Sequence, residues 1–279
     1  ISIDHRDPIA GCPTREVMRT INTSDGMRKS PVAVIDAHAH CGVIDRSFAQ
    51  SFADYEQQVA GTDIGGVALF SPVLEIYDRY DFHFTDTPAW RLRRQKSNAS
   101  LLLLKSANLT IFPYFFIWND FAVEQLTAAH RGIKWHRHAG EPVYCYDDPR
   151  CRAALDEIGR RNLPVVLEEE LGNTLHFVRE LADGIVVIIP HLGLLNGGFR
   201  SIAEAGLWER ENVWADTALA SRDEISEYIR RYGHRRLLFG SDFPFGSPSD
   251  ELRKVRRLGL DSDVEVAVLG GNFSRLQGL

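Results

Sequence analysis

The segment Pro31-Val-Ala-Val-Ile-Asp36-Ala-His38-Ala-His40 joins a short apolar run to two histidines that are one residue apart. Side chains at positions i and i+2 of a strand lie on the same face. If that face is the inside of a barrel, the ring nitrogens of His38 and His40 can converge on one divalent cation, for which neutral imidazole is a favoured ligand. The segment therefore predicts a candidate metal site at the point where a strand stops.

The rest of the chain alternates short β-branched or aromatic runs with segments of helical periodicity, which is typical of repeated βα units around a parallel sheet. Apolar residues recur at helical spacing between the runs, as at Phe48, Phe52, Tyr55 and Val59. Eight runs are predicted to be strands, at residues 32–35, 64–70, 109–117, 132–136, 163–167, 185–189, 213–215 and 236–239.

Nearly every predicted strand is followed by polar residues. Eight βα units make a (β/α)8 TIM barrel of about 250 residues, whose active sites form at the carboxyl ends of the strands. An open doubly wound sheet is the alternative fold, but no G-x-G-x-x-G follows the first run to support it. The polar residues expected to meet at the mouth of the barrel are His38, His40, Ser71, Asn119, Asp120, Lys134, His136, Glu168, Glu169, Glu170, His191, Asp216, Thr217, Ser241 and Asp242.

The predicted domain organisation is a single α/β barrel at 31–279, preceded by an irregular N-terminal arm at 1–30. The aromatic-rich stretch 78–90 follows the second strand, where it is either a lid or substrate wall or an ordinarily packed surface loop. A basic cluster comes next and is expected on the solvated face of the following helix. It consists of Arg91, Arg93, Arg94 and Lys96.

The composition of the chain limits which binding partners and which cellular location we expect for the protein. The 279 residues are 44% hydrophobic and 25% charged, which is enough to bury a large core, and the net charge of −6 argues against nucleic acid or an acidic membrane as partner. No apolar stretch approaches the roughly 20 residues that cross a bilayer, and no secretory signal pattern is found. We therefore expect a cytoplasmic protein with a small-molecule substrate, with association into a homo-oligomer left open. The four cysteines are expected to be ordinary reduced thiols.

Five segments together resemble the amidohydrolase superfamily, the metal-dependent hydrolases with a TIM barrel. Their order and spacing along the chain make the set specific, although each segment alone is modest. They are D-A-H-A-H at 36–40, G-I-K-W-H at 132–136, I-P-H-L-G at 189–193, F-G-S-D-F-P at 239–244 and G-G-N-F-S-R-L at 270–276.

The resemblance implies roles for four of these residues. His38 and His40 would be metal ligands, and Asp242 would bind the metal and take a proton from the attacking water. His191 would hold a second metal, or polarise the substrate where one metal is present. The divalent metal would be zinc, with manganese or iron as alternatives. Water bound to such an ion can reach a pKa near ~7, which supplies hydroxide at neutral pH.

The chain departs from its relatives at the fifth strand. Relatives usually read L-P-V-x-x-H there, whereas this chain reads Leu163-Pro-Val-Val-Leu-Glu168. Glutamate can ligate zinc, manganese or iron, so Glu168 is kept as a candidate ligand. Its charge should make bound water less acidic, which would call for a harder metal or a second ion. For the neighbouring Glu169, a salt-bridged or solvated position is expected.

Lys134 and His136 share one face of the fourth strand, and three roles are open for Lys134. In some superfamily members a lysine on this strand is carbamylated and bridges two metals. An unmodified Lys134 with Arg137 would instead form a cationic pocket edge that holds a substrate carboxylate, with His136 as a further substrate-binding residue. The third possibility is an internal ion pair between Lys134 and Glu168.

The leading functional hypothesis is a metal-dependent hydrolase that uses metal-activated water to cleave the C–N or C–O bond of a small carboxylated amide, lactone or ester. Two alternatives keep the fold, a metal-dependent decarboxylase and a metal-independent lactonase. Decarboxylases of this group usually lack the second ligand histidine, so the pair His38 and His40 favours hydrolysis. A third alternative is a non-catalytic binding barrel with a decayed metal site.

Overall fold

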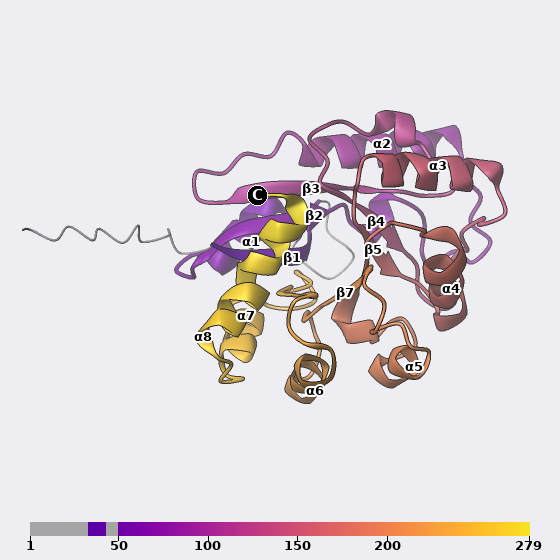
Figure 1. Ribbon diagram of the computed structural model, residues 1–279. Helices are drawn as coiled ribbons and strands as arrows, with labels where there is room; N and C mark the ends of the chain where they lie inside the picture. The colour runs from indigo at the N-terminus through magenta and orange to yellow at the C-terminus, as the bar shows by residue number, and fades with distance from the viewer. Residues whose placement is uncertain (1–32, 43–49) are drawn as a thin grey trace, which may run out of the picture. The chain divides into compact units, whose positions relative to one another are not determined.

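The computed structural model describes residues 33–42 and 50–279, and its barrel belongs to the unit Val32–Leu279. The predicted arm at 1–30 and the predicted helical residue Phe48 lie outside the described residues. Eight parallel strands follow one another around the sheet in chain order (Figure 1). They are β1 (Val34–His40), β2 (Ile64–Phe70), β3 (Thr110–Phe116), β4 (Gly132–His136), β5 (Val165–Glu168), β6 (Val187–Ile189), β7 (Val213–Asp216) and β8 (Leu237–Leu238).

The sheet closes between β1 and the segment that begins at β8. The backbone N–H of Ala37 donates to the carbonyl of Phe239 at 2.8 Å, and that of His40 donates to the carbonyl of Phe243 at 2.7 Å. In the opposite direction, the N–H of Asp242 donates to the carbonyl of His38 at 2.7 Å. Hydrogen bonds between the first and last strands remove the sheet edges, which confirms the predicted (β/α)8 barrel.

A buried carboxylate reinforces this closure. Asp36 accepts hydrogen bonds from the Ser241 amide at 2.9 Å, the Ser241 hydroxyl at 2.6 Å, the Tyr55 hydroxyl at 3.0 Å and the His38 amide at 3.1 Å. These donors come from β1, from the helix after it and from the loop after β8. The side chain of Asp36 therefore links the first strand to the segment after the last strand, beside the mouth of the barrel.

Helices follow the strands, and local signals begin several of them. Ser51 and Ser221 each form a capping box with the acidic residue three positions later, and Thr87 caps a helix whose first residue is Pro88. The helices are α1 (Phe52–Val59), α2 (Pro88–Leu101), α3 (Pro149–Arg160), α4 (Leu171–His176), α5 (Phe199–Glu204), α6 (Arg222–Tyr232), α7 (Pro248–Arg256), α8 (Ser262–Val266) and α9 (Asn272–Gln277), with shorter helical segments η1 (Val73–Glu75), η2 (Val123–Gln125), η3 (Phe177–Leu181), η4 (Pro190–Gly193) and η5 (Ala267–Gly271).

The apolar core has two parts. The larger part includes the buried faces of the helices, with Tyr55 and Val59 of α1 and Ile225 and Tyr228 of α6. The smaller part draws residues from most of the strands, as expected for side chains that fill a barrel. Its buried members are Ile35, Ala37, Ala68, Phe70, Phe112, Tyr114, Val166, Ile188, Trp214, Leu238 and Phe273.

The first strand is longer than the apolar run predicted. The run at 32–35 stops before the histidines, whereas β1 continues to His40. Its pairing with β2 shifts between Asp36 and Ala39, and Asp36 contacts Tyr55 of α1 while His38 contacts Lys134 of β4. The small alanines let the strand continue, and the irregularity directs Asp36 and His38 to different neighbours.

The basic cluster at the start of α2 is not uniformly solvated as predicted. Arg93 and Lys96 are exposed, but Arg94 is only 2% exposed. Its Nη2 lies 2.5 Å from Asp120 Oδ2 and 3.1 Å from Asp86 Oδ2, and its Nη1 donates to the carbonyl of Ile76 at 2.7 Å. Arg94 therefore ties the insertion after β2 to the loop after β3.

We predict that Arg94→Ala lowers the free energy of unfolding by about 3 kcal/mol, because it takes from Asp120 its arginine partner and from Asp86 the buried one of its two arginine partners. Denaturant unfolding followed by circular dichroism measures the loss. Arg91 also pairs with Asp86, but its side chain is 58% exposed, so Arg91→Ala is the matched control and should cost at most about 1 kcal/mol. Equal losses in the two variants would contradict the structural role of Arg94.

Among the described helices, none combines the length and the apolar character that crossing a membrane requires.

Candidate active site

A pocket of about 220 Å³ lies at the carboxyl ends of the strands, where a barrel of this kind carries its active site. Its lining combines apolar side chains with three histidines, two carboxylates and an arginine. The residues that line the pocket are His40, Val73, Arg79, His136, His138, Glu168, Leu195, Leu219, Asp242 and Phe245.

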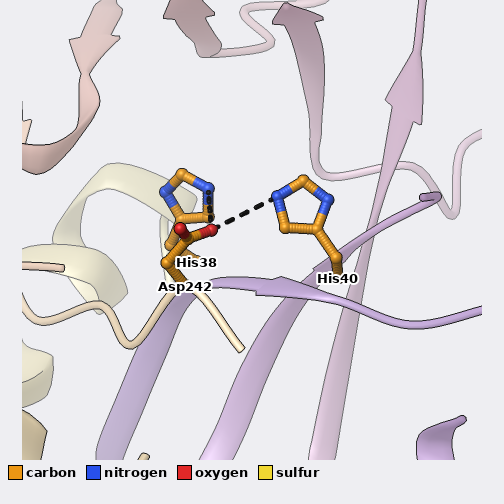
Figure 2. A group of neighbouring side chains, drawn as sticks. All are labelled: His38, His40 and Asp242. Atoms are coloured by element: carbon orange, nitrogen blue, oxygen red, sulfur yellow. Dashed lines mark ion pairs between the residues drawn. The ribbon is translucent and has the colours of Figure 1, made fainter. Parts of the chain in front are cut away.

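Three predicted ligands converge at its base. His38 Nε2 lies 3.3 Å from Asp242 Oδ1, and His40 Nε2 lies 3.5 Å from the same oxygen (Figure 2). One donor atom from each residue falls within 4.8 Å of the others, close enough for one ion to contact all three. Gly240 gives this arrangement room, because a Cβ there would come within 3.0 Å of His38 Cβ.

Asp216, at the end of β7, fixes the orientation of His38. The Nδ1–H of His38 donates to Asp216 Oδ2 at 2.8 Å, so Nε2 carries the lone pair that faces Asp242. The other oxygen of Asp216 accepts the backbone amides of His191 at 2.8 Å and Ala218 at 3.1 Å. Donors therefore occupy both oxygens, and Asp216 positions the ligands.

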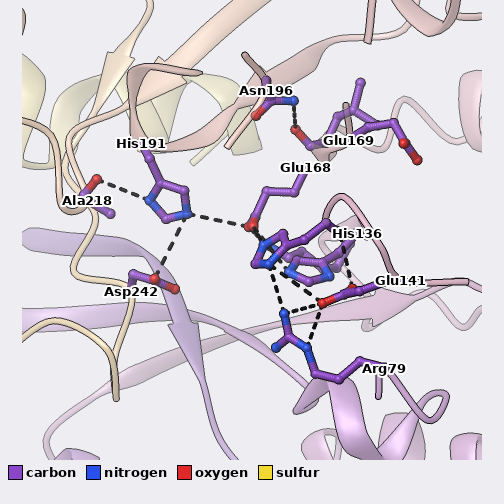
Figure 3. Close-up of polar contacts among 12 residues, drawn as sticks. Arg79, His136, Glu141, Glu168, Glu169, His191, Asn196, Ala218 and Asp242 are labelled. Atoms are coloured by element: carbon purple, nitrogen blue, oxygen red, sulfur yellow. Dashed lines mark hydrogen bonds and ion pairs between the residues drawn. The ribbon is translucent and has the colours of Figure 1, made fainter. Parts of the chain in front are cut away.

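His191 faces both carboxylates of the site (Figure 3). Its Nδ1 donates to the carbonyl of Ala218 at 3.1 Å, which leaves Nε2 pointing into the cluster. Nε2 is buried without a hydrogen-bond partner, 3.5 Å from Glu168 Oε1 and 4.0 Å from Asp242 Oδ2. A buried nitrogen in this position, beside the donors of His38 and His40, fits a site that holds a cation.

Electrostatics favour the metal-binding forms of His38 and Asp242, whereas they favour a proton on His191. Burial and the charge of Lys134 lower the pKa of His38 to about 4, so its ring is neutral at pH 7, the form that binds metals. Burial alone would raise the pKa of Asp242, but nearby histidines, His191 foremost, lower it to about 2. Burial opposes protonation of His191, yet the carboxylates of Asp242 and Glu168 raise its pKa to about 9.

Glu168 ends β5 and contacts several nitrogens. Its Oε1 lies 2.5 Å from Lys134 Nζ, while its Oε2 lies 3.2 Å from His136 Nε2 and 3.0 Å from His138 Nε2. The donor atoms of Glu168, His136 and His138 lie within 4.8 Å of one another, and Glu168 Oε1 also lies 3.7 Å from His38 Nε2. Of the three roles open for Lys134, the arrangement observed is the ion pair with Glu168.

Arg137 does not join Lys134 at the pocket edge. It is buried, and its Nη1 lies 2.7 Å from both Glu169 Oε1 and Glu170 Oε2. The expectation that Glu169 is salt-bridged therefore agrees with the structure. Arg79 lines the pocket instead, with its Nε donating to Glu141 Oε1 at 2.7 Å (Figure 3).

Three residues of this site had no role assigned from the sequence, although Asp216 was expected at the mouth. Asp216 had a signal, since it follows a predicted strand, and His138 repeats the spacing of His136. Arg79 belongs to the insertion after β2 that was expected to supply either a wall or a surface loop. Its contact with His138 Nδ1 at 2.9 Å places that part of the insertion at the pocket.

The family model described as Amidohydrolase matches residues 35–276, so the chain belongs to the amidohydrolase family. The family is one of enzymes, it is typically metal-dependent, and it includes hydrolases and decarboxylases. No curated protein matches the chain.

Solved structures share the fold at low sequence identity. A candidate 2-pyrone-4,6-dicarboxylic acid hydrolase from Pseudomonas putida is 19% identical, with a TM-score of 0.61 over 90% of this chain and 98% of its own. The 2,6-dihydroxybenzoate decarboxylase from Rhizobium is 13% identical, with a TM-score of 0.67 over 88% and 99%. An amidohydrolase from Burkholderia multivorans is 14% identical, with a TM-score of 0.63 over 89% and 100%.

We predict that Asp216→Asn weakens the binding of Zn²⁺ about 10- to 100-fold, because the carboxylate that orients His38 and makes its ring more basic is lost. Competition with a chromogenic chelator measures the affinity. The exposed Asp183 provides the control, and Asp183→Asn should bind like the unaltered protein. Equal affinity in all three proteins would contradict the positioning role of Asp216.

Proposed function

We propose that the chain is a metal-dependent hydrolase that cleaves a small carboxylated amide, lactone or ester by attack of water on a carbonyl. The observation that carries the proposal is the convergence of His38, His40 and Asp242, of which His40 and Asp242 line a pocket at the barrel mouth. The partnerless Nε2 of His191 faces the same place.

The donor set supports a divalent ion held by His38, His40 and Asp242. His191 and Glu168 lie next to these ligands. Two imidazoles and a carboxylate suit zinc, and manganese or iron are the alternatives. When bound, the ion supplies a Lewis acid that polarises a carbonyl and lowers the pKa of water.

Asp242 and His191 are the proposed catalytic residues. Asp242 directs Oδ1 at the two β1 histidines, which leaves Oδ2 to receive the proton of the attacking water. His191 is held through Nδ1 by the carbonyl of Ala218, so its Nε2–H, when protonated, can donate to the oxygen on which negative charge develops. Both side chains are held in place before substrate enters.

The pocket sets the size and character of the substrate. A volume of about 220 Å³ suits a small molecule, and Leu195, Leu219 and Phe245 offer it an apolar wall. His136 and Arg79 form the polar wall, where we place the substrate carboxylate. Lys134 is fully buried beside Glu168, and Arg137 is paired with Glu169. We therefore do not assign either residue to contact with the substrate.

The names of two structural neighbours support this range of chemistry. The Pseudomonas putida protein is named as a candidate hydrolase of a pyrone dicarboxylic acid, which is a small carboxylated lactone. The Rhizobium protein is named as a decarboxylase of an aromatic carboxylate. Assays for this chain therefore need to separate hydrolysis from decarboxylation.

A panel of small carboxylated lactones, amides and esters tests the proposal, using protein purified without chelator and then with its metal removed. Hydrolysis that is lost with the metal and restored by Zn²⁺, Mn²⁺ or Fe²⁺ is the expected result. Release of carbon dioxide from the same carboxylates would assign a decarboxylase instead. Hydrolysis that survives metal removal would assign a metal-independent lactonase, and binding without turnover would leave a non-catalytic barrel.

We predict that His38→Ala and Asp242→Asn each lower kcat/KM on the identified substrate by about 10²- to 10⁴-fold, because one removes a ligand and the other the proton acceptor. Circular dichroism should show that both variants remain folded. His176, on α4 and outside the pocket, provides the control, and His176→Ala should keep full activity. Near-normal turnover in either site variant would refute the assigned role.

A further inference from the structure

Lys134 is a buried cation next to the candidate metal ligands. Its side chain is 0% exposed, and its Nζ lies 2.5 Å from Glu168 Oε1 and 3.1 Å from His38 Nε2. The ring of Phe70 lies on a further side, with its centroid 4.8 Å from Nζ. An ammonium removed from water in this way depends on its hydrogen-bonded partners, and the main one is the Glu168 carboxylate.

The contact with His38 uses the lone pair that a metal ion would need. Asp216 accepts the Nδ1–H of His38, so the only free lone pair of the ring is on Nε2. Lys134 has only donors, and it therefore donates to that lone pair. An ion bound to His38 and the Lys134–His38 hydrogen bond exclude each other, so Lys134 must retain Glu168 alone when an ion binds.

The other oxygen of Glu168 is also engaged by a donor. Arginine cannot accept a hydrogen bond, so Arg79 donates to His138 Nδ1 at 2.9 Å, and the proton of the neutral His138 ring is on Nε2. This Nε2–H donates to Glu168 Oε2 at 3.0 Å. Glu168 is thus held by Lys134 on one oxygen and by His138 on the other, so a metal ion would have to compete with these donors for its oxygens.

We propose that Lys134 is a built-in cation that occupies the side of the centre near Glu168 and restricts the chain to one divalent ion, bound by His38, His40 and Asp242. The inference rests on the metal site of the proposed function and adds its stoichiometry. Two positive charges a few ångströms apart repel strongly in a buried site, so a second ion cannot enter while Lys134 holds Glu168.

Zinc titration of the metal-free full chain tests this inference. Equilibrium dialysis with elemental analysis counts the ions, and chelator competition gives their affinity. We expect one Zn²⁺ per chain in the unaltered protein. Lys134→Met should bind two ions, or bind the first at least about tenfold more tightly, because the competing charge is gone and Glu168 becomes available as a ligand.

Two variants serve as controls. Lys134→Arg keeps the positive charge, so it should still bind a single ion. Lys254 also pairs with a glutamate, Glu251, but lies outside the pocket, so Lys254→Met should match the unaltered protein in stoichiometry and affinity. Should Lys134→Met fail to fold, the comparison of Glu168→Gln with Lys134→Met/Glu168→Gln takes its place. The double variant should then bind Zn²⁺ at least about tenfold more tightly than Glu168→Gln alone.

The outcomes separate this inference from the proposed function. Two ions in the unaltered protein, or loss of the ion in Lys134→Met, would overturn the inference, and the latter would indicate that Lys134 is itself needed for binding. One ion in both proteins at equal affinity would overturn the inference alone and leave the metal site in place. No zinc in either protein would overturn both the inference and the metal dependence of the proposed function.

Discussion

The carboxylate of Asp36 is the constraint on which the mouth of the barrel depends. It accepts four hydrogen bonds, from the backbone and hydroxyl of Ser241, from the hydroxyl of Tyr55 and from the amide of His38. Ser241 directly precedes Asp242, so the same contacts that join the first and last strands set the position of Asp242 against His38. A carboxylate buried this deeply is stabilised only when its hydrogen bonds are made, which makes closure of the barrel and assembly of the site one event.

Charge balance shapes the rest of the site. Asp216, Asp242 and Glu168 are all buried, and each faces a histidine or Lys134. The carboxylate of Asp216 orients one ligand, while Glu168 is held by an ammonium and by an imidazole. The result is a cluster of candidate metal donors beside a carboxylate that Lys134 and His138 satisfy, and the proposed single-ion centre rests on this arrangement.

The sequence predicted the barrel well because strand periodicity and strand-end polarity are local properties. The strands at Ile64–Phe70 and Gly132–His136 match their predicted bounds, because turn residues or charged residues flank them closely. The end of β1 was missed because Ala37 and Ala39 alternate with polar residues and extend the apolar signal only weakly. The prediction that Arg94 is exposed to solvent was wrong because its partners, Asp86 and Asp120, lie on two different loops. The periodicity of a helix does not reveal such pairs.

By itself the sequence determined the fold class, the membership of a metal-binding superfamily and the residues that meet at the mouth, since strand order in a barrel fixes which ends come together. Only the tertiary structure decided the pairings among them. The ion pair of Lys134 with Glu168 depends on a distance between neighbouring strands, and packing between separate segments brings Arg79 rather than Arg137 to the pocket. The sequence gives the chemical type of each side chain. The partner that satisfies each buried charge is determined by packing between segments that are far apart in the sequence.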